Sequence, residues 1–530
     1  VVTLVSDRTL PYLDIDAVLQ AATATGADAI HPGYGFLAEN AGFAEACANA
    51  GIIFVGPPAS AIATMGDKVR AREAAMAAGV PVVPGSGGAV DIDGARAFGE
   101  SQGYPLAVKA SAGGGGRGFR VARSAEEIDE AWSGASGEAQ RYFNDPTVYV
   151  ERYFDHPRHI EIQIMADTQG NVIGLGERDC SIQRRHQKLV EESPSPAIGA
   201  EMRAAMNHTA EELARAVNYV GAGTCEFLVQ DGEFYFLEMN TRIQVEHPVT
   251  EEVTGIDLVR EQLRVAQGQP LSFGPIEQPW GHAIECRVNA EDPGRDYAPA
   301  PGTLLRYVPP AGFGVRVDTG FTEGSSIDPR FDSLIAKLIV WGGDRQEALS
   351  RLDRALADFQ IDGVATTIPL FRALLRTDEF ASGNYDTKYL ERSQLASRIT
   401  PFTPPSSQPD DDGVLVVEVD GRPYRVKLPD GIGTVASRGT RSSQRPTGRR
   451  GGTATATPGG NTLASPIQGT VLSVAVEVGQ QVEQGQLICV IEAMKMENEI
   501  TAQRAGTVTQ LGVEAGKTVQ TGAMVAVIDE

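Results

Sequence analysis

The sequence predicts a large α+β or α/β body followed by a small, flattened all-β barrel. Three observations predict this fold class. The chain has 530 residues, too many for one hydrophobic core, so we expect three or four domains. Up to about residue 403, strand-like apolar runs alternate with helix-like amphipathic stretches. The C-terminal segment contains an internal repeat.

The elements of the body follow from hydrophobic periodicity. Residues 52–55, 106–108 and 148–150 are short apolar runs typical of strands. The Ala-rich segments 15–25 and 69–79 have the spacing of amphipathic helices. Together these patterns predict a body in which helices pack on one or more sheets.

The composition changes after residue 400. Residues 401–412 are rich in Pro, Ser and Asp, which is typical of a loop. Residues 414–428 predict one β-hairpin, because two β-rich runs flank an Asp420-Gly421 turn. From 434 to 461 the chain holds mostly Gly, Ser, Thr, Pro and Arg without acidic residues, which predicts a flexible linker to which we assign no function.

The repeat places one lysine at a special position. Gly469-Thr470-Val471 recurs as Gly506-Thr507-Val508, an offset of 37 residues, and two such β-units predict a pseudo-symmetric barrel. Lys495 stands between the copies in the string Ala493-Met494-Lys495-Met496, so we expect it at an exposed hairpin tip. An ordinary surface lysine is the alternative. The coincidence of repeat, junction and flanking methionines favours a lysine displayed for covalent modification.

A glycine-rich loop follows the strand that ends at Val108. Gly113, Gly114, Gly115 and Gly116 come shortly after Lys109, where their backbone amides can approach phosphate oxygens. The lysine precedes the glycines and no GK[ST] follows, so this is not a P-loop. Taken alone, the loop fits a plain flexible turn equally well.

A pair of carboxylates is the second sign of a nucleotide site. Residues 223–229 and 233–239 predict two strands joined around Asp231-Gly232. A three-residue loop would place Glu226 opposite Glu238 on one face. Facing like charges are unfavourable, and Mg²⁺ held by one or two carboxylates and substrate phosphates relieves the repulsion.

Polar residues then alternate beyond Glu238. Extended chain would place Asn240, Arg242, Gln244 and Glu246 on one face. A half-buried strand with a solvated face is the alternative. The carboxylate pair next to this series and the mixture of polar types favour a functional site.

Composition excludes several function classes. The chain has 46 basic and 69 acidic residues, a net charge of −23, which argues against a nucleic-acid partner, and residues 183–188 form only one short basic run. The five cysteines form no CxxC pair, which favours buried thiols in a reducing cytosol over disulfides or zinc. No stretch has the ~20 apolar residues of a membrane span. The cysteine pattern of a reducing cytosol leads us to expect a cytoplasmic protein.

These motifs, together with residues 65–68, 177–181 and 285–292, closely resemble biotin carboxylase, an ATP-grasp enzyme. The resemblance runs from about Tyr12 to Glu391. Residues 461–530 resemble the biotinyl carrier family. Lipoyl domains share that barrel, but the methionines beside Lys495 favour biotin.

The resemblance implies a role for each candidate residue. Mg²⁺ or Mn²⁺ would be held by Glu226, Glu238 and Asn240, and biotin would be covalently attached to Lys495. The ATP site would comprise the lid glycines with Lys68, Lys109, Glu151, Arg152, Phe154, His159, Gln183 and His186. Bicarbonate and biotin would lie near Lys188, Arg242, Gln244 and Val245, with Glu246 as the general base and Arg287 stabilising the biotin enolate.

The resemblance also implies domain boundaries. We expect a remnant of the N-terminal α/β domain at 1–62, an ATP-grasp domain at 63–275 with a mobile lid at about 81–153, a C-terminal carboxylase domain at 276–396, a connecting region with the hairpin at 397–433, a linker at 434–461, and the biotinyl barrel at 462–530. The opening strand and the Asn-Arg-Gly-Glu-Ile-Ala turn typical of the family do not precede Val1, so the chain is expected to enter this domain near its end.

The implied activity is ATP- and bicarbonate-dependent carboxylation of biotin, the first half-reaction of an acyl-CoA carboxylase of acetyl- or propionyl-CoA type. The partners would be a biotin protein ligase and a carboxyltransferase β subunit for the second half-reaction, in a homo- and hetero-oligomer. Two alternatives stay open: a catalytically impaired biotin carrier, and the α component of a pyruvate- or urea-type carboxylase.

Overall fold

The computed structural model describes residues 1–530 except 7, 9, 111–117, 144, 186, 277, 404–413, 420–421, 428–460, 466–468, 494–495, 520–521 and 530. It describes only the backbone at 141–143, 414–419, 422–427, 493, 496–497 and 518.

The first part of the chain is a small helical layer on a two-stranded parallel sheet, β1 with β2. Its hydrophobic core includes Phe43, Cys47 and Ile52, and α1 agrees with the predicted helix over 15–25. The elements are η1 (Pro11–Leu13), α1 (Ile15–Thr25), β1 (Ala29–Ile30), α2 (Ala41–Asn49), β2 (Ile53–Phe54) and α3 (Ala59–Gly66).

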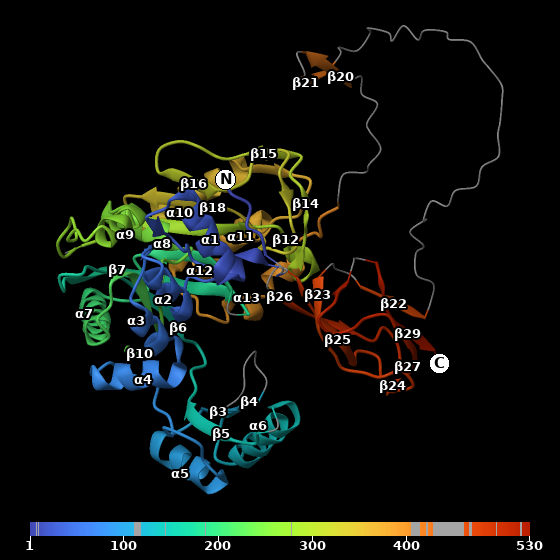
Figure 1. Cartoon of the computed structure of the whole chain (residues 1–530). Coiled ribbons are helices and arrows are strands. Elements are labelled where there is room, and N and C mark those ends of the chain that lie inside the picture. Colours follow the sequence, from blue (N-terminus) through green and yellow to red (C-terminus); the bar gives the residue numbers. More distant parts are fainter. Residues whose placement is uncertain are drawn as a thin grey trace, which may run out of the picture.

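A separate lobe follows helix α4 (Lys68–Ala77), which begins after the side chain of Asp67 caps the amides of Val69 and Arg70. The lobe packs two helices on a three-stranded antiparallel sheet in the order β4-β3-β5. Figure 1 shows it below the main body, with a core of its own around Leu106, Val108 and Val150. Its elements are α5 (Ile92–Gln102), β3 (Leu106–Ala110), β4 (Phe119–Ala122), α6 (Ile128–Phe143) and β5 (Val148–Arg152).

The centre of the body is an eight-stranded sheet in the order β10-β9-β6-β7-β8-β11-β18-β16, antiparallel throughout. The strands are β6 (Arg158–Ala166), β7 (Val172–Arg184), β8 (Gln187–Ser193), β9 (Gly221–Gln230), β10 (Glu233–Asn240), β11 (His282–Asn289), β16 (Val315–Thr319) and β18 (Leu334–Gly342). The helices against it are α7 (Ala200–Ala216), α8 (His247–Thr254), α9 (Leu258–Ala266) and α10 (Arg345–Asp358).

Alternation along these strands divides the two faces of the sheet. Ile160, Ile162 and Ile164 of β6 pack with α7 on one face. The intervening residues of β6 are polar, and they point to the opposite face, where α8 and α9 lie. The buried polar side chains of the second face become the floor of the candidate site.

Short elements complete the C-terminal part of the body around a core that includes Leu338, Leu352 and Phe371. They are β12 (Glu291–Asp292), η2 (Pro293–Arg295), β13 (Ala298–Pro299), β14 (Gly302–Thr303), β15 (Arg306–Val308), β17 (Ser326–Ile327), β19 (Gln360–Asp362), α11 (Ile368–Leu374), α12 (Asp378–Ser382), α13 (Tyr389–Ser393) and η3 (Leu395–Arg398). All five cysteines are free and buried, as predicted. None of the helices in the described part of the chain is long and apolar enough to cross a bilayer.

The predicted hairpin is β20 (Val414–Val419) paired with β21 (Arg422–Lys427), and its Asp420-Gly421 turn lies outside the described residues. The predicted linker lies outside them as well, except at its last residue.

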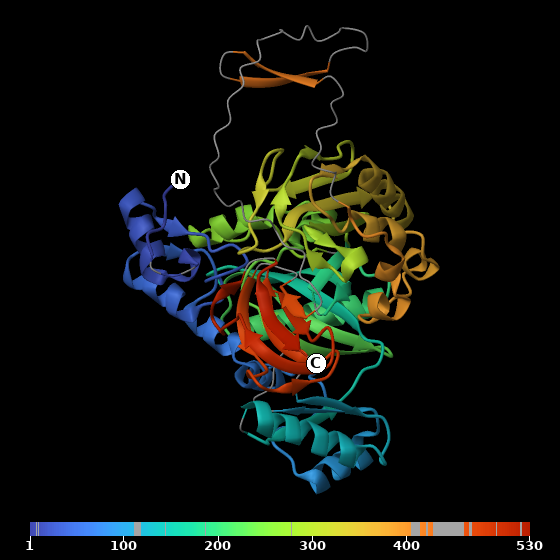
Figure 2. The same cartoon turned by 90° about the vertical axis from the view of Figure 1, so that its right-hand side faces the viewer.

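The barrel, red in Figures 1 and 2, consists of two four-stranded sheets, β22-β29-β27-β24 and β26-β25-β23-β28. The offset of 37 maps β23 (Gly469–Val474) onto β27 (Gly506–Leu511) and β24 (Gln481–Val482) onto β28 (Thr518–Val519). It also maps β25 (Leu487–Ala493) onto β29 (Met524–Asp529), while β22 (Thr462–Ala464) and β26 (Met496–Thr501) close the two sheets. The repeat therefore produces the predicted two-fold barrel.

Candidate active site

A cleft of about 1050 Å³ lies on the second face of the eight-stranded sheet. Its walls come from the loop after β1, from the sheet, from the segment after β10 and from the C-terminal part of the body. It brings together most of the predicted site residues: Lys68, His159, Gln183, Lys188, Glu226, Glu238, Asn240, Arg242, Gln244, Val245, Glu246 and Arg287.

Glu246 lies at the centre of the cleft between two cations. Nζ of Lys188 donates to Oε1 of Glu246 at 2.6 Å, and Nη2 of Arg287 donates to Oε2 at 2.8 Å. Glu246 is 2% exposed. Burial works to raise its pKa, but Lys188, Arg287 and the buried Arg178 outweigh burial and hold the pKa well below its usual range. The carboxylate is therefore ionised at neutral pH.

Glu226 collects a second set of donors. Its Oε1 accepts from Lys188 at 3.0 Å, from Asn240 at 2.9 Å and from Gln244 at 2.8 Å. Nε2 of His159 lies 3.0 Å from its other oxygen, Oε2. Burial opposes ionisation of Glu226, but Lys188 and His159 lower its pKa further than burial raises it.

Glu238 faces Glu226 on the neighbouring strand, as predicted. Burial and the charge of Glu226 raise the pKa of Glu238, as expected for two carboxylates that face each other. The two facing carboxylates are oxygen donors of the kind that Mg²⁺ prefers, whereas the Asn240 amide donates its nitrogen to Glu226 and accepts from Arg242 through its oxygen. The donor set therefore fits a divalent cation whose remaining ligands come from phosphates and water.

The register between these strands arises differently from the prediction. Gln230 pairs with Glu233, so the turn has two residues, Asp231 and Gly232, rather than three. Both have positive φ, 55° and 81°, as a type I′ hairpin turn requires. The register then shifts by one residue between Phe236 and Glu238, which brings Glu238 opposite Glu226.

The prediction of an extended polar series is correct only as far as Asn240, where β10 ends. The chain bends after Asn240, and Glu246 is the N-cap of α8. The polar side chains still line one cleft because tertiary bonds hold the bend. Arg242 donates to Asn240 at 2.8 Å and to Glu39 at 2.8 Å, and Lys337 donates to the carbonyl oxygen of Val245 at 2.9 Å.

Four predicted residues lie outside the cleft. Lys109 on β3 and Glu151 on β5 form an ion pair within the lobe sheet. Arg152 contacts Glu233 and Tyr235, and Phe154 packs in a small buried cluster with Tyr235. These contacts connect the lobe to the edge strand β10. Lys495, His186 and Gly113 to Gly116 lie outside the described residues.

The sequence reasoning missed several buried residues that hold the predicted ones. Glu161 accepts from Lys188 at 2.5 Å and from Nε of Arg178 at 2.5 Å, and both Glu161 and Arg178 are fully buried. Glu191 accepts from Arg287 at 2.6 Å. One signal was available: His159, Glu161 and Gln163 alternate with isoleucines along β6, and polar residues at every second position of an apolar strand indicate a functional face.

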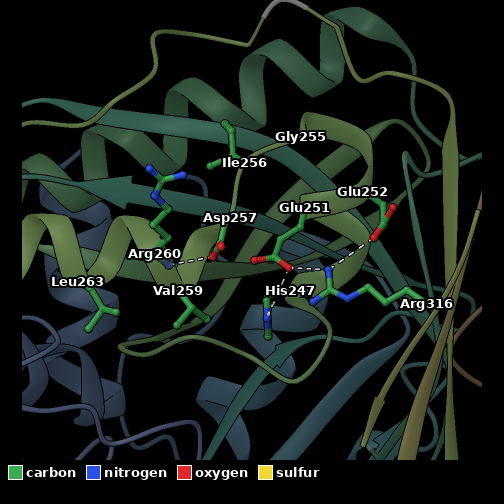
Figure 3. A pocket seen from close by; sticks show the side chains of 10 residues that line it. All are labelled: His247, Glu251, Glu252, Gly255, Ile256, Asp257, Val259, Arg260, Leu263 and Arg316. Atoms are coloured by element: carbon green, nitrogen blue, oxygen red, sulfur yellow. Dashed lines mark hydrogen bonds and ion pairs between the residues drawn. The ribbon is translucent and has the colours of Figure 1, made fainter.

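A second cavity of about 690 Å³ lies beside α8 and α9 and is shown in Figure 3. Its charges compensate one another: Nη1 of Arg316 lies 2.8 Å from Glu251 and 3.5 Å from Glu252. Burial lowers the pKa of His247 to about 3, so this imidazole is neutral. None of the predicted site residues lines this cavity, although His247 follows Glu246 directly in the chain. We therefore do not assign the chemistry to it.

The chain matches four protein-family models in order. They are the biotin carboxylase N-terminal domain at residues 2–62, the carbamoyl-phosphate synthase L chain ATP-binding domain at 67–273, the biotin carboxylase C-terminal domain at 285–392, and the biotin-requiring enzyme domain at 461–528. The chain belongs to the biotin carboxylase family. It is an ATP-dependent carboxylase ligase fused to a biotin carrier domain, so ATP and biotin are its cofactors, and the resemblance inferred from the sequence is confirmed.

Similar proteins act in different carboxylases. The biotin-dependent acyl-coenzyme A carboxylase alpha3 subunit of Mycobacterium leprae is 46% identical over 93% of this chain and 85% of its own length. A pyruvate carboxylase subunit of Methanothermobacter thermautotrophicus is 52% identical over 72% of this chain and 78% of its own. A biotin carboxylase domain dimer from the 2-oxoglutarate carboxylase of Hydrogenobacter thermophilus, solved with MgADP, ADP and bicarbonate, has a TM-score of 0.68 at 46% identity and covers 75% of this chain and 88% of that one.

Proposed function

We propose that this chain uses ATP and bicarbonate to carboxylate biotin attached to its own Lys495, as the first half-reaction of an acyl-CoA carboxylase. The observation that carries the proposal is the position of Glu246, buried in the cleft between Lys188 and Arg287. One ionised acid held by two cations provides a proton acceptor and two groups for anionic substrates in one place.

Glu246 is the general base in this proposal. Both of its oxygens form ion pairs with cations, which makes the carboxylate a weak base. Bicarbonate competes for Lys188 and Arg287, and their withdrawal from Glu246 raises its basicity as the substrate arrives. The base is thus activated by the anion that it deprotonates.

The other cleft residues position the substrates. Arg242 and Gln244, with the carbonyl of Val245, would hold bicarbonate and the biotin ring. The hydrogen bond from Arg242 to Glu39 and the one from Lys337 to Val245 fix this segment. Biotin supplies the nucleophilic ureido nitrogen when bound. Arg287 would stabilise the negative charge that develops on the ureido oxygen, because a guanidinium stays charged at every relevant pH.

ATP would occupy the space between the cleft and the lobe. Lys68, His159 and Gln183 line the cleft and would contact phosphates or ribose, together with His186. Lys109, the glycines 113–116, Glu151, Arg152 and Phe154 would cover the nucleotide from the lobe, which we propose is the mobile lid. Mg²⁺ held by Glu226, Glu238 and Asn240 supplies positive charge to the transferred phosphoryl group.

Coverage supports the acyl-CoA assignment over a pyruvate type. The acyl-CoA carboxylase relative from Mycobacterium leprae aligns with 93% of the chain, carrier barrel included, whereas the pyruvate carboxylase relative aligns with 72%. The chain would then need a carboxyltransferase β subunit for the second half-reaction and a biotin protein ligase to load Lys495. We propose a cytoplasmic homo- and hetero-oligomer.

Two variants test the assigned roles in one assay of phosphate release and biotin carboxylation. Glu246→Gln keeps the shape of the site without the base, so both rates should fall by about 10²–10⁴-fold while ATP affinity changes little. Arg287→Ala acts at the later step and should abolish biotin carboxylation while leaving slow bicarbonate-dependent phosphate release.

The exposed pairs on distant helices provide matched controls. Glu212→Gln on α7 and Arg354→Ala on α10 remove the same charges at the surface and should leave both rates unchanged. Normal turnover of Glu246→Gln, or full coupling in Arg287→Ala, would contradict the roles. A biotinylated chain that releases no bicarbonate-dependent phosphate would instead be a carrier alone.

A further inference from the structure

Two carboxyl groups face each other beneath Arg287. Glu191 on β8 and Glu285 on β11 are direct partners in the register of the sheet, and both are fully buried. Arg287 follows Glu285 by two residues on the same face of β11. This face is covered by α8, whose Val249 and Val253 pack against Ala283 and Ile339.

The pair has fewer donors than two ionised carboxylates need. Nε of Arg287 donates to Oε1 of Glu191 at 2.6 Å, and its Nη2 is bonded to Glu246. Among the described residues, Oε2 of Glu191 and both carboxyl oxygens of Glu285 have no hydrogen-bond partner. Lys337, opposite Arg287 on β18, donates to the carbonyl of Val245 instead.

Charged and titratable groups from five parts of the fold act on Glu285. They are Glu191 from β8, Arg287 from β11, Lys337 from β18, Glu246 at the N-cap of α8, and Tyr34 from the loop after β1. Burial raises the pKa of Glu285 well above its usual range; Lys337 and Arg287 oppose that shift, while Glu191 and Glu246 add to it. Burial likewise raises the pKa of Glu191 to about 7 despite Arg287.

The missing hydrogen bonds and the facing carboxyl of Glu191 also favour a protonated Glu285. An ionised carboxylate without a hydrogen bond in the interior is strongly unfavourable, and a like charge directly across the sheet adds to the cost. A proton on Glu285 removes both problems. At pH 8, where most Glu191 is ionised, Arg287 then faces two anions, Glu191 and Glu246, rather than three.

We propose that Glu285 is a buried, protonated carboxylic acid that acts as a positioning residue for biotin carboxylation by limiting the negative charge around Arg287. An ionised Glu285 would be a third anion near the guanidinium of Arg287. It would bind the guanidinium in place on the sheet and weaken its attraction for an anionic substrate. The proton on Glu285 therefore keeps Arg287 available. This inference rests on the proposed role of Arg287.

Infrared difference spectra of the full chain test the protonation state without using activity. At pH 8 the wild type should show the carbonyl stretch of a protonated carboxyl that is missing in Glu285→Gln. Glu191→Gln should retain that band at pH 8, since most Glu191 is ionised one unit above a pKa of about 7. Equal spectra for the wild type and Glu285→Gln would mean that Glu285 is ionised and would overturn the proposal.

A pH profile tests the positioning role. The ratio of biotin carboxylated to phosphate released should fall in the wild type at high pH, as Glu285 loses its proton and Arg287 is retained. In Glu285→Gln this fall should be absent or move up by about one pH unit or more. Glu261→Gln, a buried glutamate on α9 that contacts Ser272 and Arg264, is the matched control and should keep the wild-type profile.

An unchanged profile in Glu285→Gln would refute the positioning role even with the infrared band present. A wild type that never carboxylates biotin would refute the proposed function, while the infrared result would still decide the state of Glu285. The two failures are therefore distinguishable.

Discussion

The barrel repeats one β-unit twice between residues 462 and 529, whereas the cleft gathers side chains from Pro32 to Leu334. The pairing of the barrel strands follows from the 37-residue repeat, which can be recognised in the sequence. The cleft depends on sheet order, a register shift and buried ion pairs that no local pattern encodes. Substitutions in the barrel should therefore affect the barrel alone. Substitutions in the cleft should also affect the residues that the changed side chain contacts.

The largest expected effect is in the barrel and leaves the cleft unchanged. Lys495→Arg removes the only amine that we expect to be biotinylated, so the avidin-blot signal should be lost completely. Bicarbonate-dependent phosphate release with free biotin should continue, because the cleft is intact. A retained avidin signal would place the biotin on another lysine.

The ionised carboxylate of Glu192 is expected to stabilise the body. Burial works to raise its pKa, but hydrogen bonds from His282 and Arg345 outweigh it and lower the pKa from 4.5 to about 2. A lowered pKa means that the stabilisation is present above pH 4.5 and is lost as the pH falls toward 2. Glu192→Gln should cost about 3 kcal/mol at pH 7 and much less near pH 2.

Tryptophan fluorescence during denaturant unfolding can measure this loss in the body alone. The three tryptophans are Trp132, Trp280 and Trp341, and the barrel has none. Glu212→Gln is the exposed control. An equal loss of stability at both pH values would show that the ionised form of Glu192 is not the stabilising one.

A smaller effect should test the equivalence of the two repeat copies. A Cβ on Gly469 would lie 2.2 Å from the carbonyl oxygen of Glu492, and one on Gly506 would lie 2.3 Å from that of Asp529. Gly469→Ala and Gly506→Ala should each destabilise the barrel by about 2 kcal/mol through overpacking.

Protease resistance of the barrel measures this effect, and unchanged tryptophan fluorescence confirms that the body is intact. Gln510→Ala, at an exposed position of the same strand as Gly506, is the control. Very different losses at the two glycines would break the two-fold equivalence.

The smallest expected effect concerns the metal. Glu238→Gln removes one charged ligand while Glu226 keeps its other partners, so the Mg²⁺ concentration for half-maximal turnover should rise by about tenfold. Titration of phosphate release with Mg²⁺ measures the shift. If the Mg²⁺ requirement were unchanged, the Glu238 side of the hairpin would be structural.

The sequence was sufficient for the barrel and for the list of cleft residues, but not for their supports. The repeat encodes the pairing of β23 with β25 and its copy, so the two-fold barrel was predictable. Glu246 and Arg287 were found through motifs. Glu161, Glu191 and Lys337 were not, because their importance arises only when β6, β8 and β18 lie in one sheet. The bend after Asn240 was missed because tertiary bonds, rather than local periodicity, end the strand.

The register shift near Leu237 has a consequence for how the hairpin tolerates changes in length. The ladder next to the turn and the ladder that carries Glu226 and Glu238 are one residue out of step, and the extra residue separates them. We expect a deletion of one residue between Gly232 and Glu238 to be absorbed, because losing the extra residue makes the ladder continuous from the two-residue turn to Glu226 and Glu238 and leaves both carboxylates in place. Deletion of a second residue in this stretch has no such reserve and would turn Glu238 to the other face of the strand, away from Glu226. The hairpin can therefore lose one residue near its tip without changing the chemistry at its base.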